Sequence, residues 1–366
     1  MISVFGSLVG REEILNIKKC INSQWIGFGG KVSEFEKEFT KKFGVKNFAM
    51  VDSGSNALYM AVKILNLPKN SEIILPSFTW VSCAQSILMA GHKPVFCDVD
   101  INTMNITKSS IIKKITNKTK AIMVVHYAGL PVNMDEIKSL GLPIIEDAAH
   151  AVYSKYKKKH CGTIGSVGIY SFDAVKNLTT GEGGGITVNK KELLTRVKKL
   201  RYCGVGKSGF ENSSTKKNWW EYDISEPFIK MLPNNISASI GLAQLKKIDK
   251  LQKKREQIWN FYNYEFDENK HIKTPINADK DSKHSFFTYC IRVKNRNQLA
   301  KYLLKRKIYT TLRYHPLHLN KIYNQKKNFL KNTQILNKEA ISIPLHPRLT
   351  MDQCRLITKY IKEFYK

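Results

Sequence analysis

The chain has 366 residues, 42% of them hydrophobic, so it is long enough for two domains and can bury a full core. It carries 60 basic and 30 acidic residues, and this net charge of +30 attracts anionic substrates and polyanions. The basic residues are spread along the chain without a recognised nucleic-acid-binding motif, so no nucleic-acid partner is expected. No apolar run reaches membrane-spanning length and the N-terminus lacks a secretion-signal pattern, which predicts a cytoplasmic protein without a membrane partner.

The cysteine pattern argues against cross-links and structural metals. There are seven cysteines, their spacing is wide, and no Cys-x-x-Cys pair occurs. This pattern predicts reduced thiols and argues against both a disulfide framework and a zinc site.

The first 45 residues read as an arm and a helix. The pattern predicts a helix over residues 11–23, followed by a glycine-rich aromatic loop over 24–30. Apolar residues then recur at helical spacing, which predicts an amphipathic helix over 31–43 with one buried face.

Residues 47–189 alternate between short apolar runs and helical patterns. We expect helices over 55–65, 81–90, 109–115, 134–140 and 191–200, and strands over 48–51, 72–75, 94–97, 121–125, 144–145, 167–171 and 185–188. Continuous apolar strands separated by helices predict an α/β fold with a mostly parallel, seven-stranded sheet flanked by helices. The ligand of such a sheet lies beyond the carboxyl ends of its strands.

The rest of the chain predicts a linker and a second, smaller domain. A long aromatic-rich connection over 204–232 is expected to line a site or an interface. A periodic helix over 235–266 follows, and then strands over 285–293, 309–313 and 341–343 with helices over 297–306 and 351–364. We therefore expect a large domain over 1–250, including the N-terminal arm, and a small α+β domain over 251–366.

Lys176 is the residue whose setting points most directly to chemistry. It lies in the loop between two expected strands, in Ser-Phe-Asp-Ala-Val-Lys-Asn-Leu-Thr-Thr-Gly-Glu-Gly-Gly. A lysine in a tight, partly desolvated loop has a lowered pKa, which frees its amine for Schiff-base chemistry. From this stretch alone, an ordinary surface lysine is an equally good interpretation.

Five further residues at expected strand ends or helix starts suit a phosphorylated pyridine aldehyde. Gly54 and Ser55 stand at a helix start that could cradle a phosphate, and Ser171 could add a contact. Trp80 could stack on a flat ring, and Asp147 could hold a protonated pyridine nitrogen, which makes the ring an electron sink. Taken singly, these residues are explained as well by a serine cap, a core tryptophan and an aspartate capping a turn.

Together, in this order, these motifs resemble those of the DegT/DnrJ/EryC1/StrS sugar-nucleotide aminotransferases, which are fold type I pyridoxal-phosphate enzymes. The resemblance covers nearly the whole chain. The segments that carry it are Gly-Gly-Lys-Val-Ser-Glu-Phe-Glu from 29, Pro-Ser-Phe-Thr-Trp from 76, Glu-Asp-Ala-Ala-His from 146, the Lys176 loop, Asn-Ile-Ser-Ala-Ser-Ile-Gly-Leu-Ala-Gln-Leu from 235, and Tyr-His-Pro-Leu-His from 314.

The resemblance implies a role for each matching position in holding pyridoxal 5′-phosphate. Lys176 binds the cofactor covalently and then moves protons, Asp147 pairs with the ring nitrogen, and Trp80 stacks on the ring. Gly54, Ser55 and Ser171 hold the phosphate, and His150 lies near the ring hydroxyl.

The resemblance also implies a homodimer with shared active sites. The family takes one phosphate contact from the neighbouring subunit, usually an asparagine. The matching position here is Lys230, and Asn234 and Asn235 remain alternatives.

The substrates implied are L-glutamate and a nucleotide-linked keto sugar. Lys31 and Arg313 are the cations expected to meet the diphosphate, and His318 is expected to face the sugar. An alternative for the segment around Arg313 and His318 is a strand followed by a proline turn. Some relatives carry histidine in place of the lysine and dehydrate sugars, so Lys176 favours transamination.

Loose similarity around residues 310–318 favours a dTDP-linked 4-keto-6-deoxy sugar, giving an amino sugar for a glycan or surface polysaccharide. Amination at carbon 3 and UDP- or GDP-linked sugars remain open. A pyridoxal-phosphate-binding regulator is the alternative that is not an enzyme, and the retained Lys176 and Asp147 count against it.

Overall fold

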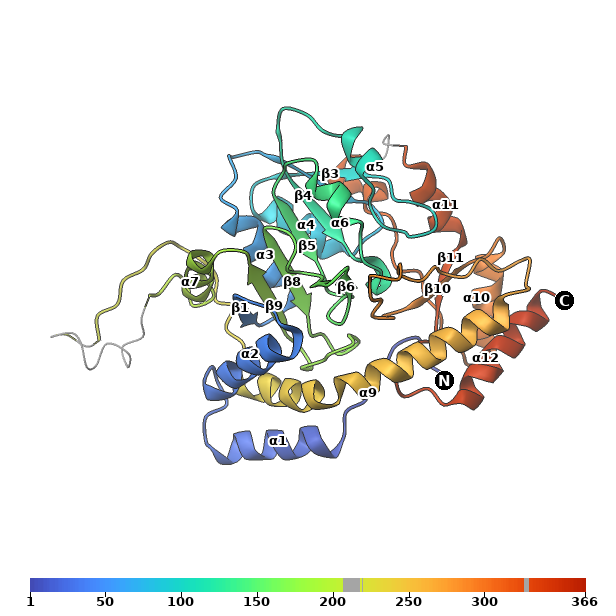
Figure 1. Cartoon of the computed structure of the whole chain (residues 1–366), viewed down its shortest axis with the longest axis horizontal. Coiled ribbons are helices and arrows are strands. Elements are labelled where there is room, and N and C mark those ends of the chain that lie inside the picture. The colour runs from blue at the N-terminus through green and yellow to red at the C-terminus, as the bar shows by residue number, and fades with distance from the viewer. Residues whose placement is uncertain (207–217, 219, 326–328) are drawn as a thin grey trace.

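The structure is a computed structural model of the whole chain, and it describes residues 1–206, 218, 220–325 and 329–366. Part of the connection over 204–232 that was predicted to line a site or interface, residues 207–217 and 219, lies outside the described residues. The remaining chain forms a large sheet-based part and a smaller part around the last two strands (Figure 1).

A seven-stranded sheet forms the centre of the large part, as predicted. Its order is β1-β9-β8-β5-β4-β2-β3. Strands β8, β5, β4, β2 and β3 pair in parallel, while β9 pairs antiparallel with both β8 and β1. In chain order the strands are β1 (Phe48–Val51), β2 (Glu72–Pro76), β3 (Lys93–Cys97), β4 (Thr119–Val125), β5 (Ile144–Asp147), β8 (Val167–Ser171) and β9 (Gly184–Val188).

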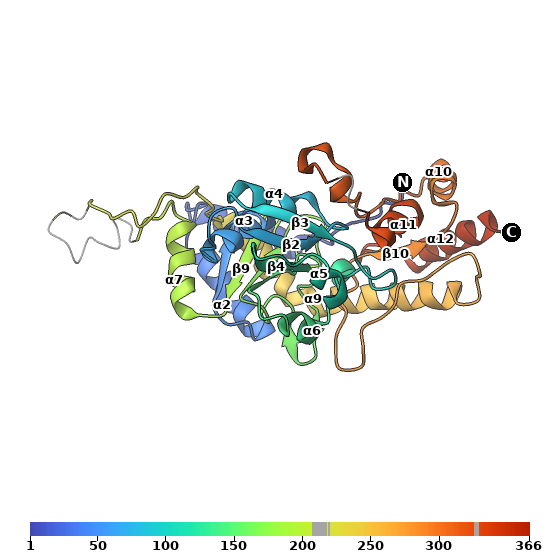
Figure 2. The same ribbon diagram turned by 90° about the horizontal axis from the view of Figure 1, so that it is seen from above.

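Helices cover both faces of this sheet, with α3 and α4 on one face and α6 and α9 on the other (Figure 2). The predicted helices are all present, within a few residues at their ends. They are α1 (Arg11–Asn22), α2 (Gly30–Phe43), α3 (Gly54–Ile64), α4 (Val81–Met89), α5 (Lys108–Ile112), α6 (Met134–Lys138), α7 (Lys191–Leu200) and α9 (Asn235–Phe266).

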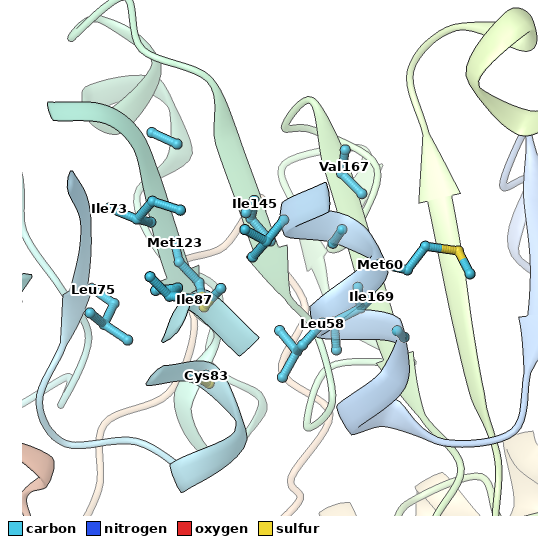
Figure 3. Close-up of a cluster of buried hydrophobic side chains, with 14 of the residues drawn as sticks. Leu58, Met60, Ile73, Leu75, Cys83, Ile87, Met123, Ile145, Val167 and Ile169 are labelled. Atoms are coloured by element: carbon cyan, nitrogen blue, oxygen red, sulfur yellow. The ribbon is translucent and has the colours of Figure 1, made fainter. Parts of the chain in front are cut away.

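Alternation along the strands explains why helices pack on both faces. In β4, Ala121, Met123 and Val125 pack against α3 and α4, whereas Ile122 and Val124 pack against α5 and α6. Figure 3 shows the first of these layers, where side chains of α3 and α4 meet those of β2, β4, β5 and β8. A strand buried on both faces must be apolar throughout, which is why continuous apolar runs predicted the sheet correctly.

The smaller part has its own hydrophobic core. It contains β10 (Tyr289–Arg292), β11 (Ala340–Ile343), α10 (Arg296–Lys305), α11 (Lys331–Glu339) and α12 (Met351–Phe364). Its core begins with Ile258 and Trp259 in the second half of α9 and continues to Ile361. The division near residue 250 stays a prediction. The first residues lie against this part, because Ile2 pairs with Ile308 and Leu345 N–H donates to Val4 O.

Two expectations for the smaller part are corrected. Residues 309–313 are not a strand, because only Thr311 makes a bridge, with Ser342. Instead, the hydroxyl of Tyr127 donates to the carbonyl of Arg313, so a side chain takes the place of a ladder bond. Helix α11 was not expected. The other short elements are β6 (Lys155–Tyr156), β7 (Lys159–His160), η1 (Tyr127–Gly129), η2 (Leu317–Leu319) and η3 (Lys321–Tyr323).

The residues that the structure describes contain neither a candidate membrane-spanning helix nor a candidate metal-binding cluster. None of their helices is both long and apolar enough to cross a membrane. In the same residues, no group of three or more His, Cys, Asp or Glu side chains could hold a metal ion.

Candidate active site

One cavity of about 470 Å³ opens at the carboxyl ends of the parallel strands. Its walls come from the turns after β1, β2, β5 and β8, from residues 309–314 of the smaller part, and from the N-terminal arm. Of the predicted site residues, the cavity is lined by Gly54, Ser55, Trp80, Asp147, His150, Ser171, Lys176 and Arg313.

The amine of Lys176 lies over the buried ring of Phe287, which adjoins this cavity. Its Nζ is 4.8 Å from the ring centroid of Phe287. Burial, and then the nearby charge of Arg313, lower the pKa of Lys176 to about 8, against the opposing charges of Asp147 and Asp173. The site therefore keeps part of this amine neutral near physiological pH.

The carboxylate of Asp147 is buried, with both oxygens held. Asp147 is the last residue of β5 and is 5% exposed. Its Oδ1 accepts a hydrogen bond from Ala149 N–H at 2.9 Å, and its Oδ2 accepts one from the thiol of Cys83 at 3.0 Å. These bonds fix the orientation of a carboxylate that also borders the cavity.

The start of α3 provides free amide groups beside hydroxyls. Ser53 is the N-cap, and its Oγ accepts a hydrogen bond from Asn56 N–H at 3.1 Å. A Cβ added to Gly54 would lie 2.7 Å from the Cβ of Ser171, so only glycine allows this close approach. The Ser55 hydroxyl is 2.7 Å from that of Ser82.

Two aromatic groups and a histidine complete the inner wall. Trp80 is 54% exposed, although it lines the cavity, so its indole is free to cover a flat ligand. His150 stacks on Phe287 with ring centroids 4.0 Å apart, and its Nε2 is 2.9 Å from the hydroxyl of Tyr314. Burial, then the charges of Lys176 and Arg313, hold the pKa of His150 well below its usual range, so it is neutral.

Arg313 brings a positive charge to the same cavity. Its guanidinium carbon lies 3.7 Å from the ring centroid of Phe5 and 5.0 Å from that of Phe287. Its Nη1 donates to the Tyr314 hydroxyl at 3.0 Å, and no carboxylate of the described residues pairs with it. This arrangement leaves a preoriented cation available to an anionic ligand.

The structure does not bring three predicted residues to this cavity. Lys31 is at the start of α2 and pairs with Glu34 at 2.7 Å. Lys230 is exposed, next to Met231, whose carbonyl accepts from Asp52 N–H at 3.2 Å. Of the two asparagines considered in its place, Asn234 caps α9, and Asn235 Oδ1 accepts from the N–H of Lys31 at 3.0 Å.

His318 does not reach the cavity either, which corrects the expected contact with a sugar. It is fully buried, and its Nδ1 is 2.6 Å from the hydroxyl of Ser77. Because Ser77 precedes the turn that carries Trp80, His318 supports that turn from behind.

Four residues of the site were missed from sequence. Tyr314 stands in a segment that was singled out, and Cys83 follows the Trp80 turn directly, so local signals existed for both. Phe5 and Phe287 are far apart in the chain, and no local pattern marks either of them.

The fold and these residues fit pyridoxal phosphate. The donor set comprises a lysine amine with a lowered pKa, a buried carboxylate, an exposed indole and a glycine-tight helix start flanked by serines. These groups match an aldehyde, a pyridine nitrogen, an aromatic ring and a phosphate, and together they define a pyridoxal-phosphate-dependent enzyme of fold type I.

Comparison with known proteins agrees with this class. A model of the DegT/DnrJ/EryC1/StrS aminotransferase family matches residues 8–362, and the chain belongs to this family of pyridoxal-phosphate-dependent sugar aminotransferases.

The dTDP-4-dehydro-2,3,6-trideoxy-D-glucose 4-aminotransferase of Saccharopolyspora spinosa is 33% identical, over 98% of this chain and 95% of the relative. The GDP-perosamine synthase of Escherichia coli O157:H7 is also 33% identical, over 98% and 97%. The crystal structure of the aminotransferase TlmJ from Streptoalloteichus hindustanus superposes with a TM-score of 0.93 at 30% identity, covering 99% of this chain and 98% of that one.

Proposed function

We propose that this enzyme transfers the amino group of L-glutamate to the 4-keto group of a nucleotide-linked 4-keto-6-deoxy sugar, with dTDP as the nucleotide. The observation that carries the proposal is the meeting of Lys176 and Asp147 in one cavity of a sugar aminotransferase chain. The name of the Saccharopolyspora spinosa relative supports carbon 4, and the names of both relatives support a nucleotide-linked sugar. One of these relatives is named for a dTDP sugar and the other for a GDP sugar. UDP- or GDP-linked sugars and amination at carbon 3 are therefore the alternatives to test.

Six residues besides Lys176 are proposed to hold the cofactor. The free amides at the start of α3 with Gly54, Ser55 and Ser171 bind its phosphate, and Trp80 covers one face of its ring. Asp147 keeps the ring nitrogen protonated. When bound, pyridoxal phosphate stores the amino group between the two half-reactions and stabilises the negative charge that forms at the donor carbon. The neutral His150 lies at the same wall and is proposed to contact the ring hydroxyl.

Lys176 is proposed to anchor the cofactor and to act as the base. A general base is most effective when its pKa lies near the working pH, and the pKa of about 8 meets this condition. The Nζ takes the proton from the α-carbon of glutamate in the first half-reaction. In the second half-reaction, the same nitrogen delivers a proton to the sugar carbon that receives the amino group.

Arg313 is proposed to attract the anionic groups of both substrates. Its guanidinium is stacked on Phe5 and bonded on one side to Tyr314, which leaves its other donors free of the described residues. A planar guanidinium binds carboxylate or phosphate oxygens through two parallel hydrogen bonds. Among the residues that line this cavity, Lys176 and Arg313 are the cationic side chains, so Arg313 is the cation that we expect the diphosphate to meet.

A homodimer is proposed to complete the site. Helix α1 and the loop after it expose Ile14, Ile21, Trp25 and Ile26, and the segment 220–229 exposes four more large apolar side chains. Apolar surface of this kind marks an interface, and a second copy of the chain is the proposed occupant. Lys31 and Lys230 are away from their own cavity, so we propose that they reach the partner's cofactor phosphate or substrate diphosphate.

We expect the enzyme in the cytoplasm. All seven cysteines are free thiols in the structure, and reduced thiols persist in that compartment.

The test is a panel of acceptors. Enzyme converted to its aminated form by L-glutamate is mixed with dTDP-, UDP- and GDP-linked 4-keto and 3-keto sugars, and return of the aldehyde absorbance identifies the acceptor. NMR of the product then locates the new amino group. Failure of every nucleotide sugar, in enzyme that glutamate does convert, would contradict the proposed acceptor class. Failure of glutamate to convert the enzyme would contradict the proposed donor.

A further inference from the structure

A buried thiol contacts the carboxylate of Asp147. Cys83 lies on the first turn of α4, is fully buried, and belongs to the hydrophobic layer between α3, α4 and the sheet (Figure 3). It does not line the cavity, yet its sulfur is 3.0 Å from Asp147 Oδ2. A buried thiol outside the cavity lining therefore holds one oxygen of a carboxylate that lines the cavity.

The direction of this hydrogen bond follows from the chemistry of its partners. An ionised carboxylate only accepts hydrogen bonds, so the thiol of Cys83 must be the donor and must keep its proton. Burial, and then the charge of Asp147, raise the pKa of Cys83 well above its usual value, which agrees with a permanent S–H group. Cys83 is therefore neither a nucleophile nor a metal ligand in this setting.

A second donor continues the chain of hydrogen bonds. The hydroxyl of Thr79 is 3.3 Å from the sulfur of Cys83. Since the S–H proton is directed to Asp147, the Thr79 hydroxyl is the donor to sulfur. Consecutive hydrogen bonds polarise one another, so Thr79 strengthens the bond that Cys83 makes.

We infer that Cys83 is a positioning residue that sets how strongly Asp147 holds the proton of the cofactor's ring nitrogen; this inference rests on the role proposed above for Asp147. A thiol is a weaker donor than a hydroxyl. It orients Oδ2 while withdrawing less charge from the carboxylate than a serine or threonine at the same place would. The carboxylate consequently stays a strong acceptor for the ring N–H.

The inference predicts an ordered series of variants. Cys83→Ser supplies a stronger donor and weakens Asp147 as an acceptor, while Cys83→Ala removes the donor and strengthens it. Cys83→Ala also frees one oxygen of the carboxylate to reorient, so we expect its dissociation constant for pyridoxal phosphate to rise about tenfold, the effect of losing a hydrogen bond to a charged group. Thr79→Val should change the acceptor strength in the same direction as Cys83→Ala, but less.

The experiment uses holoenzyme loaded with pyridoxal phosphate that carries 15N in its ring. The 15N chemical shift reports how far the ring proton is shared with Asp147. At one pH, the shifts of the Ser and Ala variants should fall on opposite sides of the wild-type value. Cys97→Ala is the matched control, because Cys97 is an equally buried thiol that donates to Leu75 O at 3.5 Å, away from the site. Titration of each apoenzyme with cofactor gives the dissociation constants.

The outcomes distinguish the role of Cys83 from the role proposed for Asp147. Unchanged 15N shifts in both Cys83 variants, or shifts on the same side of wild type, would overturn the role of Cys83. Asp147→Asn tests the underlying assignment: if it leaves the shift unchanged, Asp147 does not hold the ring nitrogen. A 15N shift that responds to Asp147→Asn but not to the Cys83 variants would contradict only the positioning role of Cys83.

Discussion

The lowered pKa of Lys176 is the property that most directly joins structure to activity. At pH 7.5, a pKa of about 8 leaves about a quarter of the amine neutral, against about one part in a thousand for a lysine at its ordinary value of 10.5. Only the neutral amine attacks an aldehyde. The rate at which apoenzyme captures pyridoxal phosphate should therefore rise with pH and level off above about 8.

Arg313→Gln tests the cause of this shift. Burial is the largest cause and the charge of Arg313 is the next, so removing the charge should move the midpoint of the capture rate upward, by roughly one pH unit or less. The rate is followed by absorbance in a stopped-flow mixer between pH 6.5 and 10. Arg355→Gln is the control, because Arg355 is exposed on α12 and pairs with Asp352.

Two results would refute the reasoning. A wild-type midpoint near 10 would show that the amine is not desolvated in solution. A midpoint that moves equally in the Arg313 and Arg355 variants would show that Arg313 has no specific effect on Lys176.

Three further predictions follow from the same structure. Gly54→Ala should bind pyridoxal phosphate more weakly, as measured by titration, because the added Cβ meets Ser171, while its circular dichroism spectrum should stay unchanged. Adding Ser171→Gly to this variant should restore part of the affinity. Lys176→Met apoenzyme should melt at a higher temperature than wild type at pH 7. This gap should shrink as pH rises from about 8 to 10.5, because the unfolded chain then binds more protons at Lys176 than the folded one. Asp98→Ala should cost about 1–3 kcal/mol in urea unfolding, since Asp98 accepts from the backbone of Asn332 and Thr333 at the start of α11; an effect as small as that of exposed Asp352→Ala would contradict it.

The large sheet could be predicted because its strands carry their own signal. Residues 121–125 are apolar throughout, and the structure buries both faces of that strand between helices. Helix α11 carried no such signal. Its own N-cap residue, Leu330, makes no side-chain cap, and the cap is supplied by Asp98 from the end of β3. A cap that comes from a distant part of the chain cannot be seen in a local pattern.

The errors have the same origin. Residues 309–313 have a strand-like composition. Their backbone, however, makes only a single bridge to Ser342, at Thr311, and the carbonyl of Arg313 accepts from the hydroxyl of Tyr127. His318 is a polar residue beside a site motif, yet it is buried inside the protein with its Nδ1 next to the hydroxyl of Ser77. In each case a distant partner decided the outcome.

The sequence by itself determined which chemistry this protein performs, because Lys176, Asp147 and the serines stand at strand ends whose pattern is local. Only the tertiary structure decided how reactive the lysine is. Phe5, Phe287 and Arg313 are far from Lys176 in the chain and meet around its amine. Desolvation and charge act through space, so the pKa that they set depends on neighbours that no stretch of sequence contains.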